Sequence, residues 1–87
     1  MAKREVAIVI FDGVQALDVA GPLDVFTAAN GFLPEQDHYQ CVLVASNTQR
    51  LRGSNAMWMM ADLSFDQADR AFDTVLAAGG PHLPASP

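Results

Sequence analysis

The sequence is poor in the residues that nucleophilic and metal-dependent sites need. Its 87 residues include one cysteine, Cys41, and two histidines, His38 and His82. One cysteine cannot form an internal disulfide, so nothing indicates an oxidising compartment. His38 precedes the apolar segment that holds Cys41 and His82 lies in the terminal region, so no cysteine–histidine catalytic pair can be identified. We expect Cys41 to be a structural thiol, and we predict neither a metal site nor a cofactor.

Basic residues are also scarce. Five Lys and Arg stand against ten Asp and Glu, which gives a formal net charge of −5. Affinity for nucleic acids depends mainly on basic side chains that neutralise the phosphate backbone. We therefore expect no direct contact between this segment and nucleic acid.

Long apolar runs are missing as well. The apolar runs at residues 6–11 and 42–45 fall far short of the roughly 20 residues that a membrane-spanning helix requires. Lys3 and Arg4 before an apolar run resemble the start of a signal peptide, but the polar pair 12–13 interrupts the run and no small-residue cleavage site follows. We expect a cytoplasmic protein without a membrane partner.

Three apolar runs are present and predict the strands of a sheet. Residues 5–11 form an unbroken run rich in β-branched side chains, which is typical of a parallel strand buried on both faces. Residues 39–45 and 73–78 form two further runs. A helical stretch separates the first two runs, so the order strand, helix, strand predicts a right-handed βαβ unit. The sequence predicts one α/β domain with a parallel sheet.

The helix that follows the first strand has clear local signals. Gly21 is the expected N-cap, Pro22 the first helical residue and Asp24 an acidic residue in the first turn. Asn30 and Gly31 predict a left-handed C-terminal stop. The residues expected on its packed face are Pro22, Val25, Phe26, Ala29 and Leu33.

Residues 49–52 and 56–60 predict a β-hairpin at the edge of the sheet. Residues 53–55, Gly-Ser-Asn, suit a three-residue connection. A short polar helical segment is expected between residues 66 and 73, and residues 79–87 have the composition of a loop.

In open parallel sheets the binding crevice lies beyond the carboxyl ends of the strands. Here those ends are residues 12–13, 46–47 and 79–80. We expect any site to be assembled around them.

Three segments together resemble a known family. They are Val-Ala-Ile-Val-Ile-Phe-Asp-Gly at 6–13, Leu-Asp-Val-Ala-Gly-Pro-Leu-Asp-Val-Phe at 17–26 and Asp-Thr-Val-Leu-Ala-Ala-Gly-Gly-Pro at 73–81. The chain resembles the DJ-1/PfpI superfamily, and within it the amidase-like (class I glutamine amidotransferase-like) sensor domain of AraC-family transcriptional regulators. Isonitrile hydratases and related enzymes are a close second. The resemblance implies that residues 1–87 are the N-terminal half of a flavodoxin-like domain, truncated before its second half.

The resemblance also implies roles for three residues. The family's nucleophile, when present, is a cysteine on a strand-to-helix turn beyond the Gly-Gly loop, so this chain is not expected to be an enzyme by itself. Asp18 is implied to be the acidic partner of that cysteine, and Gly79 and Gly80 are implied to turn backbone N–H groups toward a ligand pocket. Judged from the residues alone, Asp18 fits a helix-entry position equally well, and the two glycines fit a plain strand exit.

The hairpin carries an apolar cluster at residues 57–60, Met-Trp-Met-Met, which fits either a core position or a partner surface. We expect self-association through residues 49–60. Arg50 and Arg52 share one side of a strand, where they could bind an anion, although keeping an edge strand soluble is the favoured interpretation.

Three functions remain open from the sequence. The first is a partial sensor domain of a transcriptional regulator that binds a small metabolite without turnover through the complete domain. The alternative is the front half of a cysteine-dependent enzyme, such as an isonitrile hydratase or an amidase-like hydrolase, with Asp18 assisting the thiol. The third is an association module alone.

Overall fold

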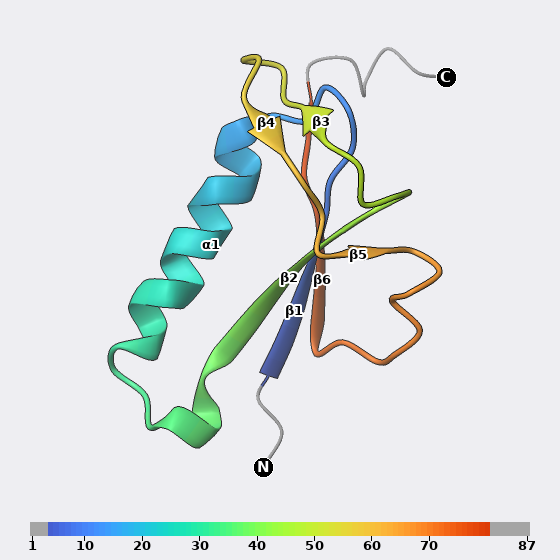
Figure 1. The fold of residues 1–87 in the computed structure, drawn as a ribbon. Helices are drawn as coiled ribbons and strands as arrows, with labels where there is room; N and C mark the ends of the chain where they lie inside the picture. Colours follow the sequence, from blue (N-terminus) through green and yellow to red (C-terminus); the bar gives the residue numbers. More distant parts are fainter. Residues whose placement is uncertain (1–3, 81–87) are drawn as a thin grey trace.

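The computed structural model describes residues 4–80, which fold into an α/β arrangement of one parallel sheet, one long helix and a small hairpin (Figure 1). The elements are β1 Arg4–Val9, α1 Ala16–Asn30, the 3₁₀ turn η1 Glu35–Asp37, β2 Tyr39–Ala45, β3 Leu51–Arg52, β4 Trp58–Met59, β5 Leu63–Ser64 and β6 Thr74–Ala77. Four of the strands form a parallel sheet in the order β5-β2-β1-β6. Helix α1 covers one face of the sheet, and the segment between β5 and β6 covers the other (Figure 1).

Strand β1 lies at the centre of the sheet and is buried on both faces. Val6 and Ile8 are fully buried in the cluster beneath α1, whereas Ala7 belongs to the cluster on the opposite face. Because successive side chains of a strand point to opposite faces, both sets of positions must be apolar. The predicted central parallel strand is confirmed. The predicted bounds of β2 are confirmed as well, and β6 falls within its predicted range.

Helix α1 begins earlier than predicted. Its N-cap is Gln15, so the predicted start at Gly21 and Pro22 is wrong. The reason is the burial of Val19, which is 4% exposed and packs in the same core cluster as Leu23. Both side chains reach this cluster only if the residues before Pro22 are already helical. Proline inside a helix lacks the N–H that would bond the carbonyl four residues earlier. Burying Val19 outweighs that cost.

The packed face and the end of α1 also differ from the predictions. Val25, predicted to pack on the sheet, is 66% exposed. Gly31 has φ −65°, so the predicted left-handed stop is wrong. The helix end is instead joined to β2 by the Asn30 side chain. Its Nδ2 donates to the carbonyl of Tyr39 at 2.9 Å, and its Oδ1 accepts from the Tyr39 N–H at 2.7 Å.

The predicted β-hairpin is confirmed, with shorter strands than expected, but its predicted place at the edge of the parallel sheet is wrong. β3 and β4 form their own two-stranded antiparallel sheet. The hairpin bonds to the loop between β1 and α1, since the Gly13 N–H donates to the carbonyl of Arg52 at 2.7 Å and the Ser54 N–H donates to that of Val14 at 2.8 Å. Strand β5 pairs with β2 at the sheet edge and was not predicted.

The segment between β5 and β6 contains no helix, so the polar helix predicted there is wrong. Only residues 65–67 form a turn, and the apolar side chains of Ala68 and Phe72 follow it and pack on the sheet. Oε1 of Gln67 accepts from the Ser64 N–H at the start of the segment. Residues 81–87 of the predicted terminal loop, including His82, lie outside the described residues. Within residues 4–80 no helix is long and apolar enough to cross a membrane.

Candidate functional site

The structure brings Asp18 and Gly79 together at the carboxyl end of the sheet. Asp18 lies in the first turn of α1, and Gly79 follows β6. The Gly79 N–H donates to Oδ2 of Asp18 at 3.0 Å, and the carbonyl of Gly79 accepts from the Gln15 N–H at 2.8 Å. Both backbone groups of Gly79 are therefore held by the start of α1.

The two glycines are needed because other atoms approach them closely. A Cβ on Gly79 would lie 2.8 Å from Oδ2 of Asp18. A Cβ on Gly80 would lie 3.0 Å from the carbonyl oxygen of Gly13 and 3.1 Å from the ring of Phe11. The Gly-Gly pair is thus more than a simple strand exit, since it lets the loops after β1 and β6 lie against each other. Whether these residues contact a ligand remains a prediction.

The loop after β1 is held by the hairpin. Asp12 accepts a hydrogen bond from the Arg52 N–H at 3.0 Å through Oδ1. Gly13 has φ +88°, a left-handed conformation that favours glycine, and its N–H bonds to Arg52 as well. These bonds fix the position of Asp12 and Gly13 at the strand end.

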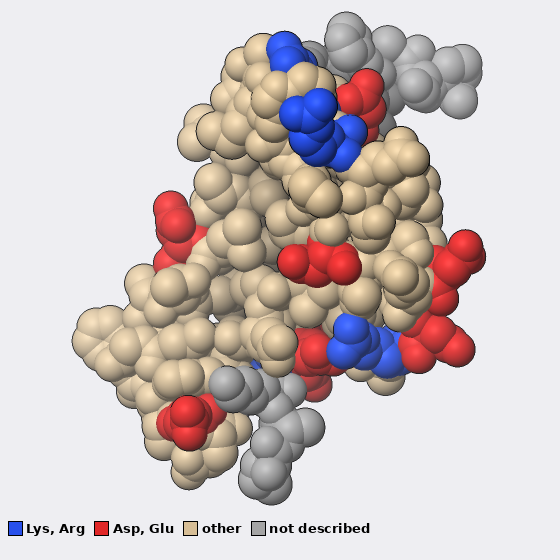
Figure 2. Space-filling model, viewed as in Figure 1, with Lys and Arg blue, Asp and Glu red and all other residues tan. Residues whose placement is uncertain are grey.

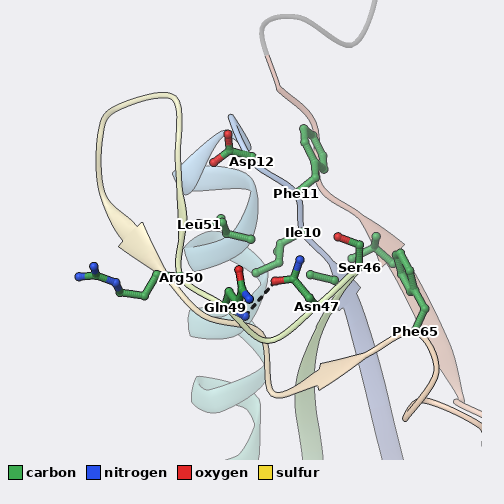
Figure 3. Close-up of a pocket in the computed structure, with 11 residues that line it drawn as sticks. Ile10, Phe11, Asp12, Ser46, Asn47, Gln49, Arg50, Leu51 and Phe65 are labelled. Carbon is green, nitrogen blue, oxygen red and sulfur yellow. Dashed lines mark hydrogen bonds between the residues drawn. The ribbon is translucent and has the colours of Figure 1, made fainter.

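A pocket of about 380 Å³ opens beyond the carboxyl ends of β1 and β2, next to this loop (Figure 3). Its size is within the range usual for small-molecule sites. It is lined by Val9, Ile10, Phe11, Asp12, Ala45, Ser46, Asn47, Gln49, Arg50, Leu51 and Phe65. Its lining combines apolar side chains with hydroxyl, amide and carboxylate groups, so the pocket suits a small molecule with an apolar part and hydrogen-bonding groups.

Two polar side chains of the pocket, those of Asn47 and Arg50, are held by contacts with neighbouring residues. Oδ1 of Asn47 accepts from the Gln49 N–H at 2.9 Å, which turns the segment after β2 back toward β1 (Figure 3). The Arg50 side chain points away from the pocket (Figure 3), and its guanidinium lies over Trp58. The sequence indicated the strand end at 46–47 but not these side chains. The polar run Ser-Asn-Thr-Gln directly after β2 is the signal that could have indicated them.

The pocket and the Asp18–Gly79 contact are neighbours that share one wall. Phe11 lines the pocket, and its ring is also the group that a Cβ on Gly80 would meet. The contact between Asp18 and Gly79 holds the loop that carries Gly80. The Asp18–Gly79 contact is thus connected to the pocket wall through Gly80 and Phe11.

Cys41 lies in β2 and packs against the core cluster beneath α1. Burial raises the pKa of the Cys41 thiol above its ordinary value of 9.0. The thiol is therefore protonated at neutral pH, as expected for a structural cysteine. Among residues 4–80 no three His, Cys, Asp or Glu side chains are grouped so that they could hold a metal ion.

The reactivity of Cys41 provides a test of this environment. Because thiolate is the reactive form and the pKa is raised, we expect Cys41 to react with a disulfide reagent at pH 8 several-fold more slowly than free cysteine. The rate should increase as the pH passes 9, and the denatured chain should react at the rate of an ordinary thiol. Rapid labelling of the folded chain at pH 7 would contradict a partly buried thiol with a raised pKa.

Comparisons with known proteins agree with this geometry. The DJ-1/PfpI family matches residues 4–87. An uncharacterised protein from the cpoL 5′ region of Streptomyces lividans is 37% identical over 84 residues, which cover 97% of this chain and 57% of that protein. The chain thus spans little more than half the length of this curated relative.

Solved structures share the fold at low identity. A ThiJ/PfpI family protein from Pseudomonas syringae superposes with a TM-score of 0.75 at 18% identity, over 92% of this chain and 30% of that one. An AraC family transcriptional regulator from Pseudomonas putida gives 0.73 at 17%, over 88% and 47%. DJ-1beta from Drosophila melanogaster gives 0.74 at 18%, over 92% and 40%. Together with the sequence match over residues 4–87, the parallel sheet and its glycine-rich strand end establish that this chain belongs to the DJ-1/PfpI family.

Proposed function

We propose that the chain is the N-terminal half of a ligand-sensing domain of a transcriptional regulator, and that it binds a small metabolite without turnover. The observation that carries the proposal is the pocket of about 380 Å³ beyond β1 and β2, whose lining combines apolar side chains with amide and hydroxyl groups. The shared fold with an AraC family regulator supports the regulatory setting.

The position of Asp18 supports binding over catalysis. Its Oδ2 accepts the Gly79 N–H, so the carboxylate joins α1 to the loop after β6. In this role Asp18 and Gly79 shape the pocket wall, and Gly80 lets Phe11 approach. We propose that these residues are positioning residues of the site and that the ligand contacts come from the polar groups after β2.

The pocket composition limits the kind of ligand. Asp12 contributes a carboxylate to the lining, whereas the guanidinium of Arg50 is directed toward Trp58. An anionic group at this rim would be repelled by Asp12. The proposal therefore favours a neutral or cationic metabolite, in a cytoplasmic protein whose DNA-reading part lies outside these residues.

A substitution that fills the pocket tests the site. Ser46 is exposed and lines the pocket, whereas the neighbouring Thr48 is exposed and does not line it. We expect Ser46→Trp in the full-length protein to weaken metabolite binding at least tenfold, about 1.4 kcal/mol, because the indole occupies the pocket. Thr48→Trp is the matched control and should bind as the unmodified protein does.

The measurement is a thermal-shift screen of a metabolite library, followed by titration of the compounds that stabilise the protein and by mass spectrometry of each after incubation. A stabilising compound that is recovered unchanged supports a sensor. Steady consumption of that compound would instead support the cysteine-dependent enzyme. Equal binding by Ser46→Trp would show that the pocket is not the site.

A further inference from the structure

Two aromatic side chains line the pocket beyond β1 and β2. Phe11 comes from the loop after β1, and Phe65 follows β5. Within residues 4–80 neither ring pairs with another aromatic ring. Phe65 is 54% exposed, although its backbone is held by the bond from its N–H to the carbonyl of Ala45 at 2.9 Å. An exposed phenyl ring on a fixed backbone offers a flat apolar surface to a ligand.

Two amide side chains of the same pocket, those of Asn47 and Gln49, lie across from these rings (Figure 3). Because Oδ1 of Asn47 accepts the Gln49 N–H, the Nδ2 group of Asn47 is left as a donor. The Gln49 side chain makes no hydrogen bond to any residue of the described range 4–80. Its carboxamide therefore presents a donor and an acceptor side by side.

The basic side chains near the pocket are directed elsewhere. The guanidiniums of Arg50 and Arg52 lie 4.6 and 3.8 Å from the centroid of the Trp58 ring. Figure 2 shows basic side chains gathered over the hairpin. The carboxylate of Asp12 is the other charged group of the lining, and its Oδ1 already accepts the Arg52 N–H. The polar groups left for a ligand are thus mainly uncharged ones.

We propose that this pocket takes an uncharged planar heterocycle with a cyclic amide edge, which is a ring carbonyl next to a ring N–H. The inference rests on the proposed ligand-sensing function and names the class of ligand. Nε2 of Gln49 donates to the ring carbonyl, and its Oε1 accepts from the ring N–H. The flat face of the heterocycle lies against Phe65 and Phe11. A volume of about 380 Å³ admits one ring or two fused rings.

The cyclic amide edge is favoured over other polar groups because it satisfies the whole carboxamide. A hydroxyl or an ether on the ligand would pair with one group of Gln49 and cover the other, and a polar group that is covered without a partner costs free energy. An open-chain amide would satisfy Gln49 equally well, but it would leave the exposed ring of Phe65 uncovered. A carboxylate or phosphate would be repelled by Asp12.

Titration calorimetry and saturation-transfer difference NMR of the full-length protein with hypoxanthine and with uracil test the proposal. Each compound is measured beside its counterpart methylated on the amide nitrogens, which keeps the ring and the carbonyl but lacks the N–H. We expect hypoxanthine and uracil to bind, and the methylated counterparts to bind about tenfold more weakly, because a paired hydrogen bond is lost. If neither parent compound binds, or if methylation changes nothing, the proposal is wrong.

Two pairs of variants locate the contacts. Gln49→Leu should weaken binding of hypoxanthine about tenfold and abolish its preference over the methylated counterpart. Gln36→Leu, an exposed glutamine outside the pocket, is the matched control and should bind normally. Phe65→Leu should also weaken binding about tenfold, because stacking is lost. Phe32 is 90% exposed and does not line the pocket, so Phe32→Leu is its control. Equal binding by Gln49→Leu and Gln36→Leu would refute the proposed pairing.

Ser46→Trp separates the failure of this inference from the failure of the proposed function. If it blocks other stabilising compounds of the metabolite library while hypoxanthine and uracil do not bind, the ligand class is wrong and the sensing pocket stands. If it blocks no stabilising compound, the pocket is not the sensing site, and both proposals fail.

Discussion

Replacing Ile8 with alanine is expected to remove about 3 kcal/mol from the free energy of unfolding. Ile8 is 0% exposed in the centre of β1 and belongs to the core cluster beneath α1. The shortened side chain loses its transfer free energy and leaves a cavity that the neighbouring strands cannot close, since they are fixed by parallel pairing on both sides. In a chain of this size the loss lowers the thermal midpoint by about 15 °C.

Val75→Ala is the matched control for Ile8→Ala. Val75 is also a β-branched residue in a strand of the same sheet, but it is 61% exposed. We expect its replacement to change the free energy of unfolding by no more than about 0.5 kcal/mol. Chemical denaturation followed by circular dichroism measures both values. Equal losses for the two variants would mean that the far side of β6 is covered as closely as the centre of the sheet.

The sheet could be predicted from the sequence because its central strands are buried on both faces. An unbroken apolar run that is too short for a buried helix is best explained as a buried strand. The two-residue strand β5 offers no such pattern. It is placed by tertiary hydrogen bonds, as Oδ2 of Asp62 accepts the Leu43 N–H at 2.8 Å and the Phe65 N–H donates to the carbonyl of Ala45 at 2.9 Å.

The start of α1 shows where local signals mislead. Gly21 followed by Pro22 is a sound N-terminal signal for a helix in isolation. Val19 stabilises the earlier helix start by packing on the sheet, and local sequence signals do not predict such a tertiary contact. The end of the helix is similar, because the Asn30 amide finds its partners in β2, nine residues further on.

The candidate site was predictable only in part. The rule that parallel sheets bind ligands beyond their carboxyl ends indicated the edge at which the pocket opens, and the family resemblance singled out Asp18, Gly79 and Gly80. Their contact joins residues 61 positions apart, which spacing alone does not reveal. The strand end at 46–47 was predicted as part of the site, but Gln49 was missed because the direction of loop side chains depends on where the hairpin bonds to the loop after β1.

Asn30→Ala is expected to cost about 2 kcal/mol of stability, although it removes only one amide group. The two hydrogen bonds of that amide satisfy both the N–H and the carbonyl of Tyr39 at the start of β2, where they are partly buried. Leaving a buried backbone group without a partner costs roughly 1–3 kcal/mol, more than the net gain from an ordinary hydrogen bond. The end of α1 should then separate from β2, and amide hydrogen exchange should increase in both.

Asn55→Ala is the matched control for Asn30→Ala, because it measures what the loss of an asparagine side chain costs in an exposed turn. Oδ1 of Asn55 accepts the Met57 N–H at 3.1 Å, a local contact in an exposed turn. Its loss should cost about 0.5 kcal/mol and leave exchange in α1 unchanged, because water can replace the bond. If Asn30→Ala costs no more than Asn55→Ala, α1 is held on the sheet by Val19, Leu23 and Phe26 alone, and the polar link at its end contributes nothing to the position of Asp18 at the other end.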